Sequence, residues 1–217
     1  MKQRTGNQTC ILCRQGPPIQ NSHILSKFII RWIKDNAPAG HLRWSRQPNK
    51  PEQDAWTADY LCEACEQRLS QAENAFKQEV FDHAVARTAG TFPYSASVGA
   101  AVLSMFFRHL RFTGDVQGNG LPKVLDELRK KLVSTLGGDP DWAHLYMVPL
   151  AFETKAQDRV PGYNQYLLSL DGYWFDYHLN NQAFWIGAVK LPFLQLVLSE
   201  QPLDVLALRQ GLRVAVR

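Results

Sequence analysis

The residues best suited to chemistry in this sequence are its four cysteines, which fall in two Cys-x-x-Cys pairs. The first pair is Cys10 and Cys13, and the second is Cys62 and Cys65. Two such pairs form a tetrahedral Zn²⁺ site when the fold brings them together. Because all four ligands would be thiolates, no coordination position is left for water or substrate, and we expect a structural zinc. The alternative is a pair of disulfides, which a chain without a recognisable secretion signal disfavours.

A second set of candidate residues lies between and just after the cysteines. His23 stands in a Ser-His-Ile segment after the first pair, and Glu66 follows the last cysteine directly. Glu66 and Glu73 share one face of an expected helix with apolar residues, and a buried acid needs a metal, a cation or a hydrogen-bond donor. Arg68 and Lys77 are the candidate ion-pair partners of Glu73. Glu66 could instead complement the dipole at the helix start, and His23 could be a core or capping histidine.

Charge is unevenly distributed along the chain. Residues 1–50 carry nine Lys or Arg and one acid, a net charge of +8, whereas residues 51–100 carry three bases and eight acids, a net of −5. A helix expected after His23 has an apolar face and, at spacings of four and three, a basic face of Lys27, Arg31 and Lys34. This face predicts contact with phosphates, although a solvated helix face is the alternative.

The remaining segments predict an α+β fold. Residues 35–57 contain three prolines and one glycine and predict a loop. A helix is expected to start at the second cysteine pair. Residues 97–112 predict a buried helix and 121–136 an amphipathic one that ends at a Gly-Gly pair. Strands are expected at 146–152, 165–170, 173–178 and 184–189, with Asp171-Gly172 as a hairpin turn. We therefore expect a zinc module over residues 1–90 and a helical, then β-rich, C-terminal domain over 91–217, whose antiparallel sheet is rich in aromatic residues. Those aromatic residues favour a core over a base-stacking platform.

The 48 residues between the two cysteine pairs leave room for a hairpin, a helix and a loop inside the ring that zinc would close. A treble-clef fold has this arrangement, with the second pair at the start of a helix. The elements Cys10-x2-Cys13, Ser22-His23-Ile24 and Leu61-Cys62-x2-Cys65 resemble the HNH endonucleases, the ββα-metal nucleases. The sequence is still more similar to uncharacterised bacterial proteins with the pattern SHIIPKF, RW, N-K-x2-QD and LCxxCE. The resemblance covers about residues 8–82 and says little about residues 90–217.

The resemblance implies metal-dependent hydrolysis of phosphodiester bonds in DNA or RNA. His23 matches the general base, and histidine is the side chain that ionises nearest physiological pH. Glu66 matches a ligand of a catalytic Mg²⁺ or Mn²⁺, and Glu73 could assist it. Asn49 matches the residue that orients the base, with Asp54 as its alternative. The residues expected to contact the phosphates are Lys27, Arg31, Lys34 and Arg43.

Three departures from the family pattern leave another function open. Ser22 stands where many members have an acid, Ser26 replaces the usual proline, and the helix after the second pair has no histidine before His83. The alternative is a non-catalytic zinc-stabilised module that binds nucleic acid or a partner protein. A third hypothesis is a structural subunit that assembles through the apolar segments 191–197 and 203–208.

The setting expected for such a protein also comes from the resemblance. Small nucleases of this kind are commonly effectors of bacterial antiviral defence, often with a partner ATPase, and that context is an analogy. No apolar run reaches the roughly 18 residues that span a bilayer, so we expect a cytoplasmic protein.

Overall fold

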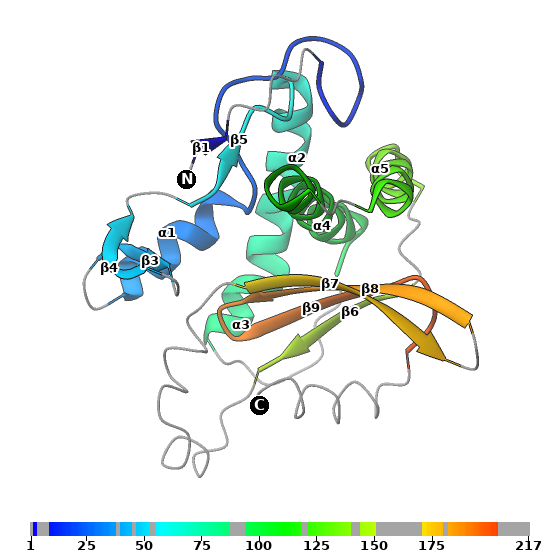
Figure 1. Ribbon diagram of the computed structural model, residues 1–217. Coiled ribbons are helices and arrows are strands. Elements are labelled where there is room, and N and C mark those ends of the chain that lie inside the picture. Colours follow the sequence, from blue (N-terminus) through cyan, green and yellow to red (C-terminus); the bar gives the residue numbers. More distant parts are fainter. Residues whose placement is uncertain are drawn as a thin grey trace.

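The structure is a computed structural model that describes the chain in ten stretches. They are residues 2–3, 9–37, 40–44, 47–52, 55–86, 94–118, 121–139, 144–150, 171–179 and 182–203. Figure 1 shows helix α4 near the centre, with α2 on one side, α5 on the other and the largest sheet beneath them. The predicted strand at 165–170 lies outside the described residues.

The amino-terminal part is built from very short strands. Strands β1 (Lys2–Gln3), β2 (Ser22–His23) and β5 (Thr57–Ala58) form a sheet in the order β1-β5-β2. The β2 strand is antiparallel to β5, with Ser22 opposite Ala58 and His23 opposite Thr57. Because two-residue strands supply few hydrogen bonds, other contacts must hold this sheet in place.

Helix α1 (Lys27–Asn36) follows β2, as the periodicity predicts. It buries Ile29 and Ile30, and Phe28 and Trp32 pack edge-on against Phe81 with ring centroids 5.2 and 6.0 Å apart. The loop predicted over residues 35–57 is wrong in part. It contains a hairpin of β3 (Leu42–Trp44) and β4 (Gln47–Glu52), which tolerates two prolines because both strands are edges.

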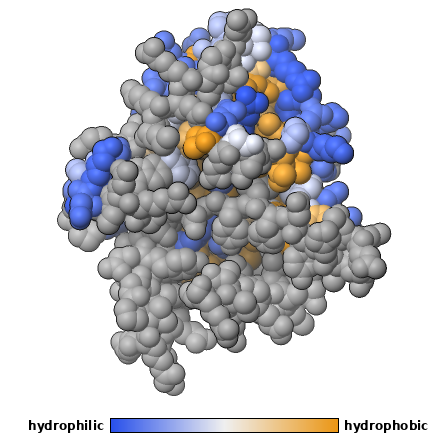
Figure 2. All heavy atoms as spheres, in the orientation of Figure 1, coloured by the Kyte–Doolittle hydropathy of each residue, from blue (hydrophilic) through white to orange (hydrophobic). Residues whose placement is uncertain are grey.

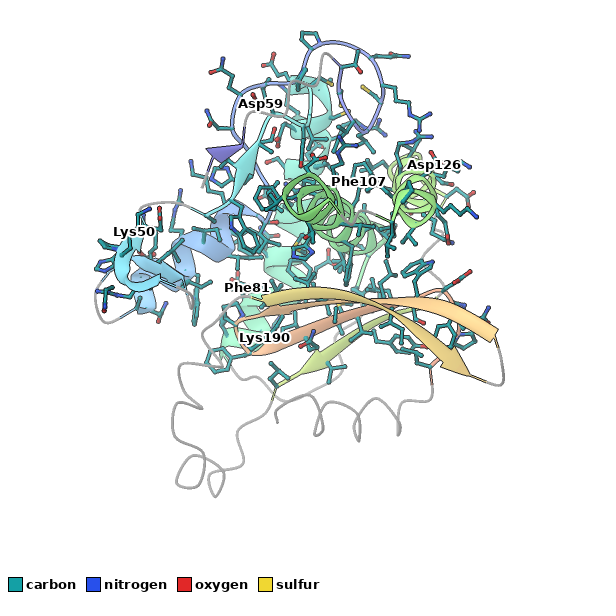
Figure 3. All side chains as sticks on the ribbon, in the orientation of Figure 1. Lys50, Asp59, Phe81, Phe107, Asp126 and Lys190 are labelled. Carbon is teal, nitrogen blue, oxygen red and sulfur yellow. The ribbon has the colours of Figure 1, made fainter. Side chains whose placement is uncertain are left out.

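A long helical stretch begins at the second cysteine pair. Helix α2 (Glu63–Phe76) continues through a π-helical segment η1 (Lys77–Phe81) into α3 (Asp82–Ala86). The η1 segment buries Val80 and Phe81, and Figure 3 shows Phe81 where the helical part meets the sheet.

Two further helices confirm the predictions made from the spacing of apolar residues at 97–112 and 121–136. Helix α4 (Ala96–Gln117) is buried all round from Val98 to Leu110, because α2, α5 and strand β8 pack against it. Helix α5 (Pro122–Leu136) buries Val124, Leu128 and Leu132. It starts with a proline and ends at the predicted glycines, where Gly138 takes a φ of +96°.

The largest sheet is antiparallel, with the strand order β6-β9-β8-β7. Its strands are β6 (Leu145–Pro149), β7 (Asp171–Leu179), β8 (Gln182–Leu191) and β9 (Leu194–Ser199). One prediction is wrong here: Asp171 and Gly172 are not a turn but the start of β7, opposite Lys190 and Val189. The apolar segment 191–197 comprises the end of β8, a turn and most of β9, and it is buried within the protein. Of the segment 203–208, only Leu203 lies within the described residues.

One hydrophobic core joins these elements. It runs from Cys10 and Leu12 through α1, α2, α4 and α5 to Leu196 and Leu198 on the sheet. On the opposite face of the sheet, Phe184, Ile186 and Val197 form a smaller cluster with Tyr146. Phe184 and Trp185 are both buried, which agrees with a core role for these sheet aromatics. In the described part of the chain, no helix combines the length and the apolar character that crossing a membrane requires.

Candidate functional site

The four cysteines converge, as their spacing predicts. Their sulfur atoms all lie within 4.8 Å of one another, and Cys13 Sγ is 3.7 Å from Cys62 Sγ. Sulfurs at about 2.3 Å from a tetrahedral Zn²⁺ lie about 3.8 Å apart, so the spacing fits that ion. All four are free thiols, which excludes the disulfide alternative in this structure. The cluster is consistent with a structural zinc site.

The first pair sits in a tight turn that the backbone stabilises. The Cys10 amide donates to the carbonyl of Gly16, and the Arg14 amide donates to the carbonyl of Cys10. Arg14 and Gly16 both adopt positive φ angles, of 61° and 64°. The Gln15 amide donates to Cys13 Sγ at 3.4 Å, an interaction that supports a thiolate at this position.

The second pair is positioned by a helix start. Cys62 is the N-cap of α2 and Cys65 lies in its first turn. Backbone hydrogen bonds join the preceding residues to the first pair's loop: the Ile11 amide donates to Tyr60 and the Ile19 amide to Leu61. The loop, the chain before α2 and the helix therefore meet at the four sulfurs.

The thiols differ in their ease of ionisation. Burial alone would raise the pKa of Cys10, but amide donors from Cys62, Cys13 and Leu12 outweigh it and lower that pKa below the ordinary value. Burial raises the pKa of Cys13 and of Cys65. A metal binds cysteines as thiolates and must displace their protons, and the raised pKa values of Cys13 and Cys65 add to this cost, so zinc affinity should fall at low pH.

His23 lies on strand β2, beside this zinc module. The neighbouring Ile24 amide donates to the Trp56 carbonyl, which extends the pairing of β2 with β5. The carbonyl of His23 accepts a 2.6 Å hydrogen bond from Arg108 Nη1 on α4. The His23 side chain is half-buried, so it is not sealed inside the core.

Two oxygens at positions that the HNH resemblance assigns to metal ligands have no partner. Glu66 Oε1, in the first turns of α2, and Ser22 Oγ, next to His23, are buried and accept or donate no hydrogen bond. A buried oxygen without a partner is costly and needs an explanation such as an ion or a water. The carboxylate of Glu66 suits Mg²⁺ or Mn²⁺, whereas a neutral Ser22 hydroxyl is a weaker ligand than a carboxylate.

Glu73 is engaged elsewhere in the protein. Its Oε1 accepts a hydrogen bond from Arg108 Nη2, and the guanidinium is almost fully buried. The two partners that the sequence suggested are wrong. Arg68 donates to the Leu136 carbonyl, and Lys77 pairs with Asp82 at 2.7 Å.

The four cysteines are the only group of three or more His, Cys, Asp or Glu side chains arranged to hold a metal among the described residues. Asn49 is exposed on β4, in the hairpin that Figure 1 shows beside α1, away from the amino-terminal end of α2. Asp54 lies outside the described residues. The structure therefore does not bring His23, Glu66 and Glu73 together into a second such group.

The predicted phosphate contacts are largely accessible. Lys27, Arg31 and Arg43 are exposed, and Lys34 is half-buried at the end of α1. Figure 2 shows hydrophilic residues gathered over the β3–β4 hairpin, where Lys50 lies, and over the opposite side of the molecule, where α5 lies. On that opposite side Asp126 is paired with Arg14 and Lys130.

Sequence reasoning missed the contribution of α4. Arg108 contacts Glu73 and His23, and Asp115 accepts a 2.7 Å hydrogen bond from the Tyr60 hydroxyl. One signal was available: Arg108 is one of two arginines in the otherwise mostly apolar helix predicted at 97–112, and a buried cation needs an acid.

A comparison of this chain with protein-family models, with curated proteins and with solved structures found no match.

Proposed function

We propose that this protein hydrolyses phosphodiester bonds of DNA or RNA, with His23 as the general base. The observation that carries the proposal is the pairing of β2, which carries the half-buried His23, with β5, the strand that leads to the cysteine cluster at the start of α2. Strands β2 and β5 pair antiparallel and α2 follows β5, which supports a strand–strand–helix arrangement like that of the ββα-metal nucleases, with α1 and the β3–β4 hairpin inserted between the two strands. The unpartnered Glu66 oxygen supplies a candidate ligand near the start of that helix.

In this mechanism the zinc cluster has a structural task. It holds the loop before β2 against the chain that enters α2, through the Ile11 and Ile19 hydrogen bonds. His23 would take the proton from the attacking water with a ring nitrogen. Glu66 would hold a divalent cation, which when bound would stabilise the negative charge on the phosphate.

The substrate would be held by the basic face of α1. Lys27 and Arg31 lie one helical turn apart and are both exposed, so they can contact neighbouring phosphates of one strand. Lys34 and Arg43 extend the same positive region toward the β3–β4 hairpin. If the side chains neutralise phosphates, each contact contributes about 0.9 to the slope of log affinity against log salt on duplex DNA.

The test is cleavage of supercoiled plasmid, single-stranded DNA and RNA with Mg²⁺ or Mn²⁺. Wild type, His23→Ala and Glu66→Gln are compared with His83→Ala, a histidine on α3 that has no role in the proposal. We expect cleavage to fall at least about 100-fold in His23→Ala and to persist in His83→Ala. Equal rates in wild type and His23→Ala, or no cleavage with any substrate, alone or with a co-expressed partner ATPase, would refute the nuclease.

A second candidate function is a non-catalytic zinc-stabilised module that binds nucleic acid. It is favoured by Glu73, whose ion pair with Arg108 removes it as a ready metal ligand, and by the single metal-type group among the described residues. Binding measured by fluorescence anisotropy separates the two functions. A binding module would bind without cleavage and lose affinity in Lys27→Ala/Arg31→Ala but not in His23→Ala.

A further inference from the structure

Arg108 is one of two basic side chains among the large, fully buried residues of the described part of the chain. It is 1% exposed on α4, a helix whose other buried residues are mostly apolar. Its guanidinium makes three contacts: Nη1 donates to the His23 carbonyl, Nη2 donates to Glu73 Oε1, and Nε lies 3.3 Å from the Ser104 carbonyl. Three elements, β2, α2 and α4, therefore meet at one side chain.

Packing alone does not explain an arginine at this position. Burying an ion pair costs desolvation that its attraction often fails to recover, and a well-packed apolar replacement is frequently as stable. What the guanidinium provides is direction, because its donors are fixed in one plane and point at defined acceptors. One donor fixes the His23 carbonyl, and another fixes the carboxylate of Glu73 on α2.

The contact bears directly on the orientation of the His23 ring. The carbonyl belongs to His23 itself, so the Arg108 contact ties the backbone from which the imidazole side chain extends to α4, and through Glu73 to α2. Strand β2 is only two residues long, and the peptide after His23 is held on its amide side by the Ile24 hydrogen bond to Trp56. The Arg108 hydrogen bond adds a second restraint on the carbonyl side of that peptide.

We propose that Arg108 is a positioning residue that fixes the His23 side chain relative to helix α2. This inference rests on the proposed nuclease function and assigns to α4, which lies outside the region of HNH resemblance, a part in the reaction. Glu73 holds the guanidinium of Arg108 in place by accepting its second hydrogen bond. Because a misplacement of about 1 Å can cost 100-fold in rate, loss of Arg108 should reduce turnover and leave substrate binding intact.

The kinetic test compares Arg108→Met, Arg108→Lys and Glu73→Gln with Arg111→Lys. Arg111 is the matched control, since it lies on the same helix and its ion-pair partner is Asp115, also on α4. We expect kcat to fall about 100-fold in Arg108→Met with KM within about twofold, and to fall less in Arg108→Lys, which keeps a donor. A raised KM at unchanged kcat, or wild-type kcat in Arg108→Met, would overturn the proposal.

A spectroscopic test separates this inference from the nuclease function. The ring signals of His23, assigned with His23→Ala, are recorded by NMR for wild type, Arg108→Lys and Arg111→Lys. We expect the His23 signals to shift or broaden in Arg108→Lys and to match wild type in Arg111→Lys. Arg108→Lys is used because it keeps the positive charge, so the test does not depend on whether Arg108→Met folds. Unchanged signals overturn the positioning role whatever the activity. Shifted signals in a wild type that cleaves nothing refute the nuclease and leave the control of His23 by Arg108 standing.

Discussion

The two ends of the molecule differ in the length of their strands. At the end that carries the cysteine cluster, called here the zinc end, strands β2 and β5 have two residues each. At the end formed by the four-stranded sheet, called here the sheet end, β7, β8 and β9 have nine, ten and six residues. The zinc end is held by four sulfurs, by backbone bonds between two loops and by polar contacts from α4. The sheet end is held by a continuous ladder and by apolar burial, with every residue of β9 buried. The two ends share one core, but different forces hold them.

This difference assigns separate tasks to the two ends. A region held by ligands and directed hydrogen bonds can keep a half-buried side chain such as His23 in one orientation. A region held by apolar area is less directional and serves as the base on which α4 rests. Helix α4 connects them, because it packs against α2, α5 and β8.

The first prediction is that removing the metal unfolds the zinc end locally and leaves the sheet folded. Structural zinc contributes about 10 kcal/mol or more in small zinc modules, which is comparable with the whole stability of a domain. In Cys62→Ser, or after chelation, we expect the amides of Ile11, Ile19 and Ile24 to lose protection from hydrogen exchange. The amides of β8 and β9 should stay protected, as mass spectrometry of exchanged peptides can measure.

The control for that experiment is Gln67→Ser, an exposed position on the same helix. It should bind one zinc per chain and exchange like wild type. Two results would contradict the prediction. In one, the amides of the zinc end are equally protected from exchange in Cys62→Ser and in wild type. In the other, the amides of the sheet lose protection in Cys62→Ser as fast as those of the zinc end.

The second prediction concerns the sheet. Leu196 on β9 is 0% exposed and belongs to the main core, so Leu196→Ala should lower the unfolding free energy by about 3 kcal/mol. Zinc content should remain at the wild-type level. The matched control is Val133→Ala on α5, which is 42% exposed and should cost less than about 0.5 kcal/mol. Denaturant melts with a parallel zinc assay measure both, and a loss of zinc in Leu196→Ala would contradict the separation.

The same contrast explains what the sequence could predict. Cysteine spacing and helical periodicity are local signals, so the zinc cluster, α1, α2, α4 and α5 follow from them. The β8–β9 turn was missed because Pro192 and Phe193 occupy it, and Phe193 adopts a φ of 58° where glycine or asparagine is the usual signal. Asp171-Gly172 gives a strong turn signal, but both residues pair with β8.

The surroundings of His23 could be predicted only in part. The sequence indicated that an acid on the apolar face of α2 needs a partner, and Glu73 has one. The partner's identity depends on how α4 packs, since Arg108 is 35 residues away along the chain. Lys77, four residues from Glu73, satisfies the local spacing rule and Arg68 is close in the sequence, yet both contact other groups. Long-range packing therefore decides which charges meet, and no local pattern records it.

The third and smallest prediction concerns the second polar contact of α4 with the zinc end. Burial raises the pKa of Tyr60 well above its ordinary value, and the Asp115 carboxylate, which accepts its hydrogen bond, raises it further. Tyr60 therefore stays protonated in the folded protein while the unfolded chain ionises above about pH 10. Its contribution to stability is fully present below that pH and is lost as the pH rises past it.

Tyr60→Phe should accordingly cost about 1.5 kcal/mol at pH 7, where the hydrogen bond to Asp115 is lost. Above pH 10 the difference between wild type and Tyr60→Phe should shrink, because only wild type loses stability by ionising this tyrosine on unfolding. Urea melts at pH 7, 9 and 10.5 measure the difference. A gap that stays constant across this range would mean that the hydroxyl is not held protonated by its surroundings. A gap that shrinks would show that Asp115 on α4 holds the chain before the second cysteine pair through the buried hydroxyl proton of Tyr60, a contact separate from that of Arg108 with β2.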